Sequence, residues 1–211
     1  GLGLFETILR EDTVRFWSGL RGMSQGLGDE AAVVVDLNAS FRGLPGVPQG
    51  VAEKGRFLRA SWIAPVEERE VLTESWSTID GAMRSMALNL KEAELMDFNI
   101  PLPSSSEKND VVTWYYDAFA FSDDVKPSIT VSEDWFVASS SRQQALDLVA
   151  AVESPAPEVR YGAWACLDLD VLRDYLEEAL KLIDEEGESL IADEAVLSEF
   201  RSNLPVILDG L

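Results

Sequence analysis

VVTWYYDAFAF, at residues 111–121, is the clearest strand signal in this 211-residue chain. It is rich in aromatic and β-branched side chains, which fit the half-buried, pleated surface of a β-sheet. Two shorter runs follow, at residues 128–131 and 135–138, on either side of the polar residues 132–134. This spacing is typical of a β-hairpin, so the middle of the chain is predicted to form neighbouring antiparallel strands.

Further strands are predicted on both sides of this stretch. AAVVVDL at residues 31–37 is short, continuous and β-branched, the pattern of a buried strand. FLRASWIAPV at residues 57–66 alternates between two faces and predicts a second strand, and RYGAWACLD at residues 160–168 predicts another. Residues 43–50 and 99–110 are rich in proline and polar residues, and they are interpreted as loops.

Apolar residues recur at helical spacing in several other parts of the chain. They predict amphipathic helices over residues 4–27 and 67–90. A later helix is expected to begin at Leu169 and to break at Gly187, because glycine is a poor helix former. A last helix is predicted over residues 188–203.

Ser140 and Ser141 mark the start of one more helix. Each serine is followed three residues later by a glutamine, which is the spacing of a capping box. The helix is expected to run to Val152, because the segment that follows, residues 153–158, contains two prolines.

The order of these elements indicates the fold class. Several connections between strands are short enough for hairpins, which favours an α+β fold over a doubly wound parallel sheet. We expect a mostly antiparallel sheet with helices packed on one face, in a single domain over residues 1–211. The runs AAVVVDL and WACLDL both leave an apolar strand through Asp-Leu, which suggests two related halves divided near residues 153–158. The start at Gly1 and the late apolar run LPVIL suggest a fragment of a longer chain.

Composition excludes several kinds of chemistry. The chain has no histidine, one cysteine and a formal net charge of -21. It therefore has no Ser-His-Asp triad, no imidazole metal site and no internal disulfide. The acidity disfavours nucleic-acid binding, and no run of ~18 apolar residues is present that could span a membrane. Cys166 lies in an apolar stretch and is predicted to be buried and inert.

Asp117, Asp123 and Asp124 are the candidate catalytic residues, because carboxylates are the only abundant reactive groups. Two carboxylates can act as acid and base, or as acid and nucleophile, when their surroundings separate their pKa values. The alternative interpretation places Asp117 on a solvated strand face and the other two in a turn. The acidic run at residues 184–188 lacks the ligand pattern of an EF-hand, so no metal site or cofactor is predicted.

Trp76 and Trp135 are the candidate ligand-binding residues among six tryptophans. An exposed indole can stack on a sugar ring or pack on a peptide. The alternative is that both serve the core, because most tryptophans here lie among apolar neighbours. A protein or a glycan is therefore the kind of partner that the sequence favours.

Five short runs together resemble a loose group of long, uncharacterised bacterial extracytoplasmic proteins, which are domains of unknown function. The runs are AAVVVDL (31–37), LPGVP (44–48), LRASWIAPV (58–66), ESW (74–76) and WFVASSS (135–141). The resemblance covers roughly residues 30–180 and carries over no functional residues. It implies a periplasmic or secreted setting and a longer parent chain.

These observations favour a non-enzymatic binding or scaffold domain of a larger extracytoplasmic bacterial protein. Two alternatives stay open. One is a carboxylate-dependent hydrolase acting on a glycan through the three aspartates named above. The other is an acidic surface that binds a basic partner, since 13 acidic and four basic residues lie from Arg160 onward.

Overall fold

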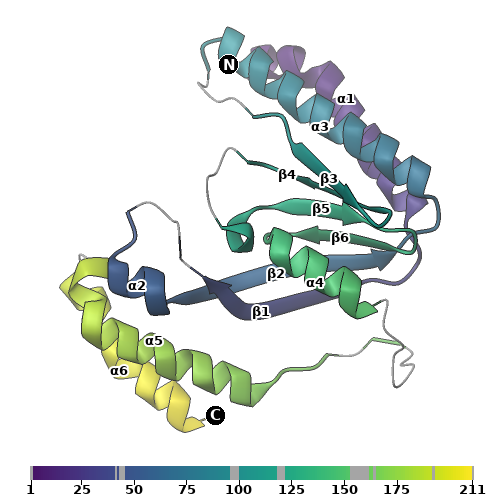
Figure 1. Cartoon of the computed structure of the whole chain (residues 1–211). Helices are drawn as coiled ribbons and strands as arrows, with labels where there is room; N and C mark the ends of the chain where they lie inside the picture. The colour runs from purple at the N-terminus through teal and green to yellow at the C-terminus, as the bar shows by residue number, and fades with distance from the viewer. Residues whose placement is uncertain are drawn as a thin grey trace. The chain divides into compact units, whose positions relative to one another are not determined.

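The computed structural model divides the chain into two compact units that interleave along the sequence (Figure 1). Unit 1 comprises Gly1–Val34, Trp62–Phe119 and Pro127–Ser139, and unit 2 comprises Val35–Ser61, Ala120–Lys126 and Ser140–Leu211. The structure describes residues 2–40, 42, 46–95, 100–117, 122–152, 162–163, 165–191 and 193–210, with the backbone alone for residues 2–8. The predicted division at residues 153–158 lies outside the described residues.

The fold is α+β, with a six-stranded antiparallel sheet, as the sequence predicts. The strands are hydrogen-bonded in the order β1-β2-β6-β5-β4-β3. The division between the units passes through β1 and β2. The strands are β1 (Ala32–Ser40), β2 (Arg56–Pro65), β3 (Ser104–Lys108), β4 (Val111–Tyr115), β5 (Ser128–Val131) and β6 (Trp135–Ser139).

The helices also match most of the predicted segments. Between the first two strands lies a short helix, α2, in place of the end of a predicted loop. The helices are α1 (Leu2–Gly26), α2 (Gln49–Lys54), α3 (Arg69–Glu92), the 3-10 turn η1 (Asp123–Val125), α4 (Arg142–Val152), α5 (Leu169–Leu190) and α6 (Glu194–Gly210).

Unit 1 contains the antiparallel meander β3–β6. The predicted hairpin of β5 and β6 is confirmed, with Val131 opposite Phe136. β4 ends at Tyr115, earlier than predicted, and residues 118–121 lie outside the described residues. β3 corrects the prediction of a loop over residues 99–110. β3 was not predicted because its sequence is polar. Asn109 and Asp110 have φ of 52° and 62°, the backbone of a type I′ hairpin turn between β3 and β4.

The apolar core of unit 1 lies between the meander and its two long helices. Leu72 of α3 packs with Val131 and Phe136 at the centre, and all three are at most 2% exposed. Trp62 meets the Phe136 ring edge-on at a centroid distance of 5.5 Å. Partly buried apolar side chains surround this centre: Met23, Leu27, Val66, Trp114, Ile129 and Ala138.

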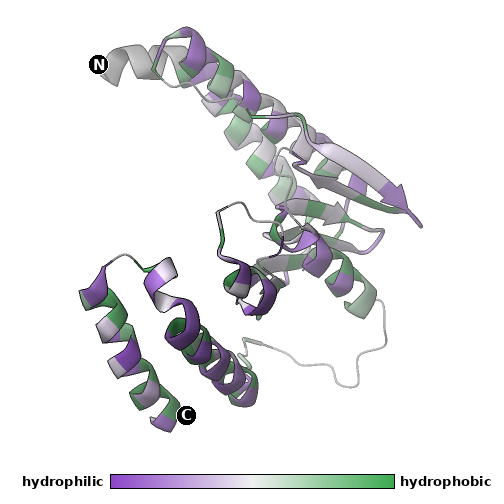
Figure 2. Cartoon of the chain, turned by 60° about the vertical axis from the view of Figure 1, so that its left-hand side comes forward, coloured by the Kyte–Doolittle hydropathy of each residue, from purple (hydrophilic) through white to green (hydrophobic). Residues whose placement is uncertain are grey.

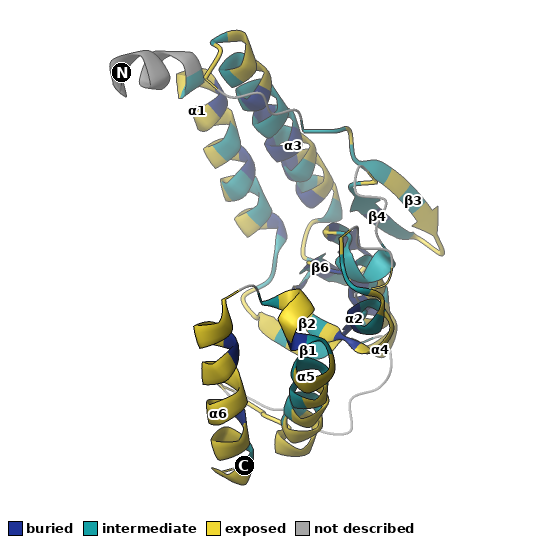
Figure 3. Cartoon of the chain, turned by 90° about the vertical axis from the view of Figure 1, so that its left-hand side faces the viewer, coloured by how far each residue is buried: buried dark blue, intermediate teal, exposed yellow. Residues whose placement is uncertain are grey.

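Helices α1 and α3 lie side by side, and the buried residues of each lie along the line where they meet (Figure 3). Glycine permits this close approach. A Cβ on Gly19 would lie 2.6 Å from Ile79 Cγ1, and one on Gly26 would lie 2.8 Å from Leu72 Cγ. Gly22 likewise faces Ser75. This packing role of the glycines was not predicted from the sequence.

In unit 2, α4 begins where the capping box predicts. The backbone N–H of Gln144 donates to Ser141 Oγ at 3.1 Å, which confirms Ser141 as the cap. The helix ends at Val152, as expected. Asp168 caps α5 in the same way, accepting from the N–H groups of Asp170 and Val171.

Helices α5 and α6 form the C-terminal pair of unit 2 (Figure 2). The predicted break at Gly187 is wrong, because α5 continues through this residue to Leu190. Gly187 is buried, and a Cβ there would lie 2.7 Å from Leu197 Cδ1 of α6, so the glycine serves helix packing. None of the described helices is long and apolar enough to cross a bilayer.

Two further predictions are corrected by exposure. β1 is not a buried strand: it lies at the edge of the sheet, where Val33 is 72% and Val35 is 52% exposed. The strand predicted over residues 160–168 is absent at residues 162–163 and 165–168, the part that the structure describes. Cys166 is consequently an exposed thiol rather than a buried one.

Candidate functional site

Arg59 lies at the centre of a buried polar cluster in unit 2. It belongs to β2, where alternation along the strand directs it to the same face as Ser61. Its guanidinium is bidentate to Asp36, with Nε–Oδ1 of 2.8 Å and Nη2–Oδ2 of 2.7 Å. The remaining edge, Nη1, donates to Asp124 Oδ1 at 3.0 Å. Arg59 is 9% exposed, so both carboxylates are held by one largely buried cation.

Hydrogen bonds extend this cluster to α4. Gln144 Nε2 donates to Asp36 Oδ2 at 3.0 Å, and Ser61 Oγ donates to Gln144 Oε1 at 2.7 Å. Gln144 and Ser61 are each 2% exposed. We call Asp36, Arg59, Ser61, Asp124 and Gln144 the Arg59 network. It joins β1, β2, η1 and α4 through side chains that satisfy one another.

Asp36 and Arg59 favour each other's charged forms. Burial raises the pKa of Asp36, but hydrogen bonds from Arg59, from the Asn38 N–H and from Gln144, with the Arg59 charge, lower it below its usual value. The hydrogen bond to Asp36 raises the pKa of Arg59 despite burial. A carboxyl whose folded pKa is depressed stabilises the fold at neutral pH, and this contribution is lost as pH falls through that pKa.

An open groove lies beside the network in the same unit. It has a volume of about 510 Å³ and is lined by the end of β1, the end of α2, the start of β2 and one side of α5. Asn38 and Ser40 connect the two features. Both line the groove, while the Asn38 N–H donates to Asp36 and the Ser40 N–H donates to Asp124 at 3.3 Å.

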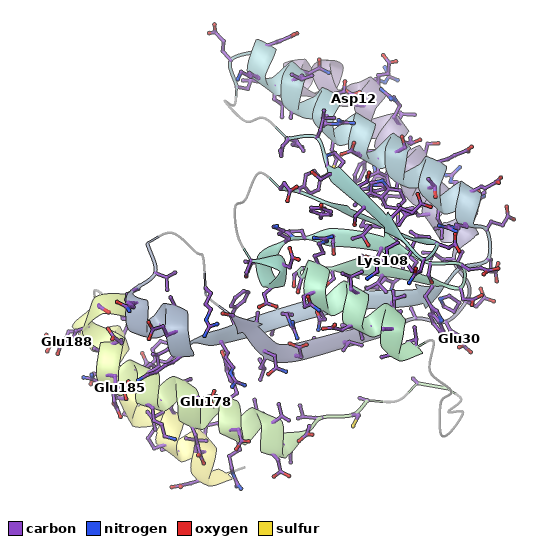
Figure 4. All side chains as sticks on the ribbon, in the orientation of Figure 1. Asp12, Glu30, Lys108, Glu178, Glu185 and Glu188 are labelled. Carbon is purple, nitrogen blue, oxygen red and sulfur yellow. The ribbon has the colours of Figure 1, made fainter. Side chains whose placement is uncertain are left out.

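The groove carries both signs of charge. Its basic residues are Arg42, Lys54, Arg56 and Lys181, and its acidic residues are Glu53, Glu178 and Glu185. Figure 4 labels Glu178 and Glu185, which project from α5. The mixture contrasts with a chain whose formal net charge is -21.

Two ion pairs join residues that line the groove. Lys54 Nζ lies 2.5 Å from Glu185 Oε2, and the hydrogen bond and charge of Glu185 raise the pKa of Lys54. Arg56 Nε lies 3.3 Å from Glu178 Oε2. About half of each of these four side chains is exposed, so each pair is expected to contribute little stability.

The predicted carboxylates have separate partners. Asp124 is bound by Arg59, whereas Asp123 lies 3.2 Å from Lys126 Nζ and 3.3 Å from Arg142 Nη1. Asp117 belongs to unit 1, where it is exposed in the turn after β4. The two neighbouring aspartates of η1 therefore face different cations and do not share a site.

The candidate tryptophans are half-buried. Trp76 lies on α3 and Trp135 opens β6, and neither reaches the exposure of Trp17, which is 63% exposed on α1. No group of three or more Cys, Asp or Glu residues able to hold a metal ion occurs within the described ranges. The Arg59 network was missed from the sequence, and its only local signal was an arginine facing inward on an apolar strand.

Comparisons with protein-family models, with curated protein sequences and with solved structures find no match to this chain.

Proposed function

We propose that this chain is a non-enzymatic binding or scaffold domain of a larger extracytoplasmic bacterial protein, and that the groove of unit 2 is its ligand site. The observation that carries the proposal is the groove itself. Its volume of about 510 Å³ lies within the range of ~300–1,000 Å³ typical of small-molecule sites. The adjoining Arg59 network holds part of the groove lining in place, because Asp36 and Asp124 accept hydrogen bonds from the backbone N–H groups of Asn38 and Ser40.

The state of the carboxylates supports binding over hydrolysis. A catalytic acid needs a pKa raised towards neutrality, whereas the pKa of Asp36 is lowered by Arg59 and its other hydrogen-bond donors. Asp124 is bound to the same guanidinium, and Glu178 and Glu185 are paired with bases. Groups held in this way can position a ligand but are poorly placed to transfer a proton.

The extracytoplasmic setting rests on the sequence resemblance and on the acidic surface. A high net negative charge keeps a protein soluble and monomeric in an exposed environment. The setting is tested by fractionating cells that express the full-length parent. Recovery of the parent in the cytoplasm would overturn this part of the proposal.

The binding role is tested by thermal melts of the chain against sugars, sugar acids, peptides, nucleotides and divalent cations at fixed ionic strength. A ligand at about 100 times its Kd should stabilise the fold by ~2.7 kcal/mol. The Asn38→Trp variant places an indole in the groove and should abolish the shift. Glu107→Trp, at an exposed position of β3, is the matched control and should retain it.

Two results would contradict the proposal. One is a shift that survives in Asn38→Trp, which would place the ligand elsewhere. The other is turnover on a hydrolase panel that is lost in Asp117→Asn or Asp123→Asn, which would favour the carboxylate-dependent hydrolase.

A further inference from the structure

Four of the 17 Lys and Arg side chains of this acidic protein line one groove. Two of them are already used, because Lys54 and Arg56 pair with Glu185 and Glu178. The other two, Arg42 and Lys181, form no ion pair with any residue that the structure describes. Among the described residues, the groove therefore has two cations outside any ion pair, in a protein that has acidic side chains in excess.

This distribution points to the charge of the ligand. The four basic residues of the lining outnumber its three acidic residues, and the two bases outside the ion pairs can attract an anion. Resting on the proposed function of the same groove, we infer that it binds a small hydroxylated carboxylate of the sugar-acid class, with Arg42 and Lys181 as the anion-binding residues.

The charges of the lining favour carboxylates spaced along a ligand over a densely charged phosphate. The three acidic residues, Glu53, Glu178 and Glu185, lie in the same groove and repel a densely charged phosphate. Single carboxylates spaced along a ligand can meet the bases while avoiding the acids. Arginine suits this role because its planar fork binds a carboxylate through two parallel hydrogen bonds.

Hydroxyl groups of such a ligand also have partners. The Asn38 amide and the Ser40 hydroxyl line the groove and can donate to or accept from hydroxyls. Among the described residues, Leu182 is the one aliphatic side chain in the lining, and most of the others carry a charge at the end of an aliphatic stem. A polar, hydroxylated acid matches this lining better than a fatty acid does.

The test is calorimetric titration of the whole chain with trigalacturonate, with neutral maltotriose and inorganic phosphate as comparison probes. The double variant Arg42→Gln/Lys181→Gln is compared with Arg21→Gln/Arg173→Gln, which has the same net charge and alters bases outside the groove. All four side chains are exposed, so both variants are expected to fold, which melts in the absence of ligand will check.

The wild type and the control should bind trigalacturonate with Kd values within about twofold of each other, and the groove variant should lose at least ~tenfold, or about 1.4 kcal/mol. Added salt should weaken binding, because the attraction is between solvent-accessible charges. Equal binding of maltotriose, or equal losses in the two double variants, would overturn the inference. Phosphate binding that needs Arg42 and Lys181, without trigalacturonate binding, would overturn the carboxylate class.

The two proposals fail in different ways. Suppose that a neutral ligand binds the wild type and Arg42→Gln/Lys181→Gln equally but does not bind Asn38→Trp. This result would support the binding role of the groove and refute the sugar-acid inference. A flat response to every probe in both the melts and the titrations would refute both.

Discussion

Two buried clusters, one in each unit, are held together by opposite chemistry. At the centre of unit 1, Leu72, Val131 and Phe136 exclude water by apolar contact alone. In the Arg59 network of unit 2, the Arg59 guanidinium binds two carboxylates with hydrogen bonds of 2.7–3.0 Å. Apolar burial is non-directional, whereas a bidentate guanidinium fixes both distance and orientation. One chain thus combines an apolar cluster in unit 1 with a hydrogen-bonded polar network that adjoins a groove in unit 2.

The two clusters also differ in what they contribute to the free energy of unfolding. Removing apolar surface from water stabilises unit 1 by roughly 25 cal/mol per Å². In unit 2, the desolvation of Arg59 and its two aspartates offsets most of the Coulomb attraction, so the network contributes more to geometry than to net stability. Breaking the network is nevertheless costly, because the remaining charges are left without a partner.

The largest expected effect is in the apolar centre of unit 1. Phe136→Ala removes a ring that is 1% exposed and should lower the free energy of unfolding by about 4 kcal/mol. Leu102→Ala, at a position 74% exposed in the same unit, is the control and should change it by less than about 0.5 kcal/mol. Urea unfolding measures both. Equal losses would show that the Leu72–Val131–Phe136 cluster is not the stabilising core.

The next effect is in the Arg59 network. Arg59→Met keeps the aliphatic stem but leaves Asp36 and Asp124 as two uncompensated negative charges. We expect a loss of about 3 kcal/mol, the low end for buried pairs because both aspartates are partly exposed.

Arg56→Met is the matched control for this change. It breaks the exposed pair with Glu178 on the same strand and should cost less than about 1 kcal/mol. The loss in Arg59→Met should also shrink at acid pH, where Asp36 becomes protonated in the wild type as well. A loss that stays constant down to acid pH would argue that packing of the stem, and not charge, explains the effect.

Two glycine substitutions in the α1–α3 pair of unit 1 should have smaller effects on stability, and these effects should be of opposite sign. Gly19→Ala places a Cβ 2.6 Å from Ile79 Cγ1 and 3.1 Å from the Ser75 carbonyl, so the helices must separate. Overpacking should outweigh the gain in helix propensity and destabilise by about 1–2 kcal/mol. Gly81→Ala meets nothing closer than Arg15 Nη2 at 3.7 Å and should stabilise by up to about 1 kcal/mol. Thermal melts that show the same sign for both would contradict close packing through Gly19.

Features set by local sequence were the ones that could be predicted. The β5–β6 hairpin and the Ser141 cap depend on residues within a few positions of one another, and both are confirmed. The β3 strand was missed because its polar residues pair along an edge, where burial leaves no pattern. The Asn109-Asp110 turn was the available signal, since both residues tolerate positive φ.

Features set by distant contacts could not be predicted in this way. Arg59 and Asp124 are 65 positions apart, and Gln144 and Asp36 are 108 positions apart. Nothing in the spacing of these residues indicates that they meet. Gly187 was misinterpreted for the same reason, because its role depends on Leu197 of a different helix. The candidate groove is lined by residues of β1, α2, β2 and α5, which are distant from one another in the sequence. It therefore could not be predicted from the sequence.

The smallest effect refines the comparison, because unit 1 also contains a buried charged group. Asp80 is 4% exposed, accepts from the Tyr116 hydroxyl at 3.0 Å and lies 2.5 Å from Arg84 Nη2. Burial and the Asp80 charge raise the pKa of Tyr116 to about 12. A raised folded pKa favours the neutral phenol, so its contribution to stability is complete below the ordinary pKa of about 10 and is lost as pH rises through about 12.

Ultraviolet titration of tyrosinate absorbance measures this ionisation. The component with a pKa of about 12 should be absent from Tyr116→Phe and unchanged in the control Tyr175→Phe. Asp80→Asn should move it towards about 10, because a neutral amide no longer opposes formation of the phenolate. If the pKa of Tyr116 does not move in Asp80→Asn, burial and not the Asp80 charge raises it. Unit 1 would then have no electrostatic effect comparable to that of Arg59 on Asp36 in unit 2. If it moves, the Asp80 charge acts on Tyr116 in unit 1 as the Arg59 charge acts on Asp36 in unit 2, with shifts of opposite direction.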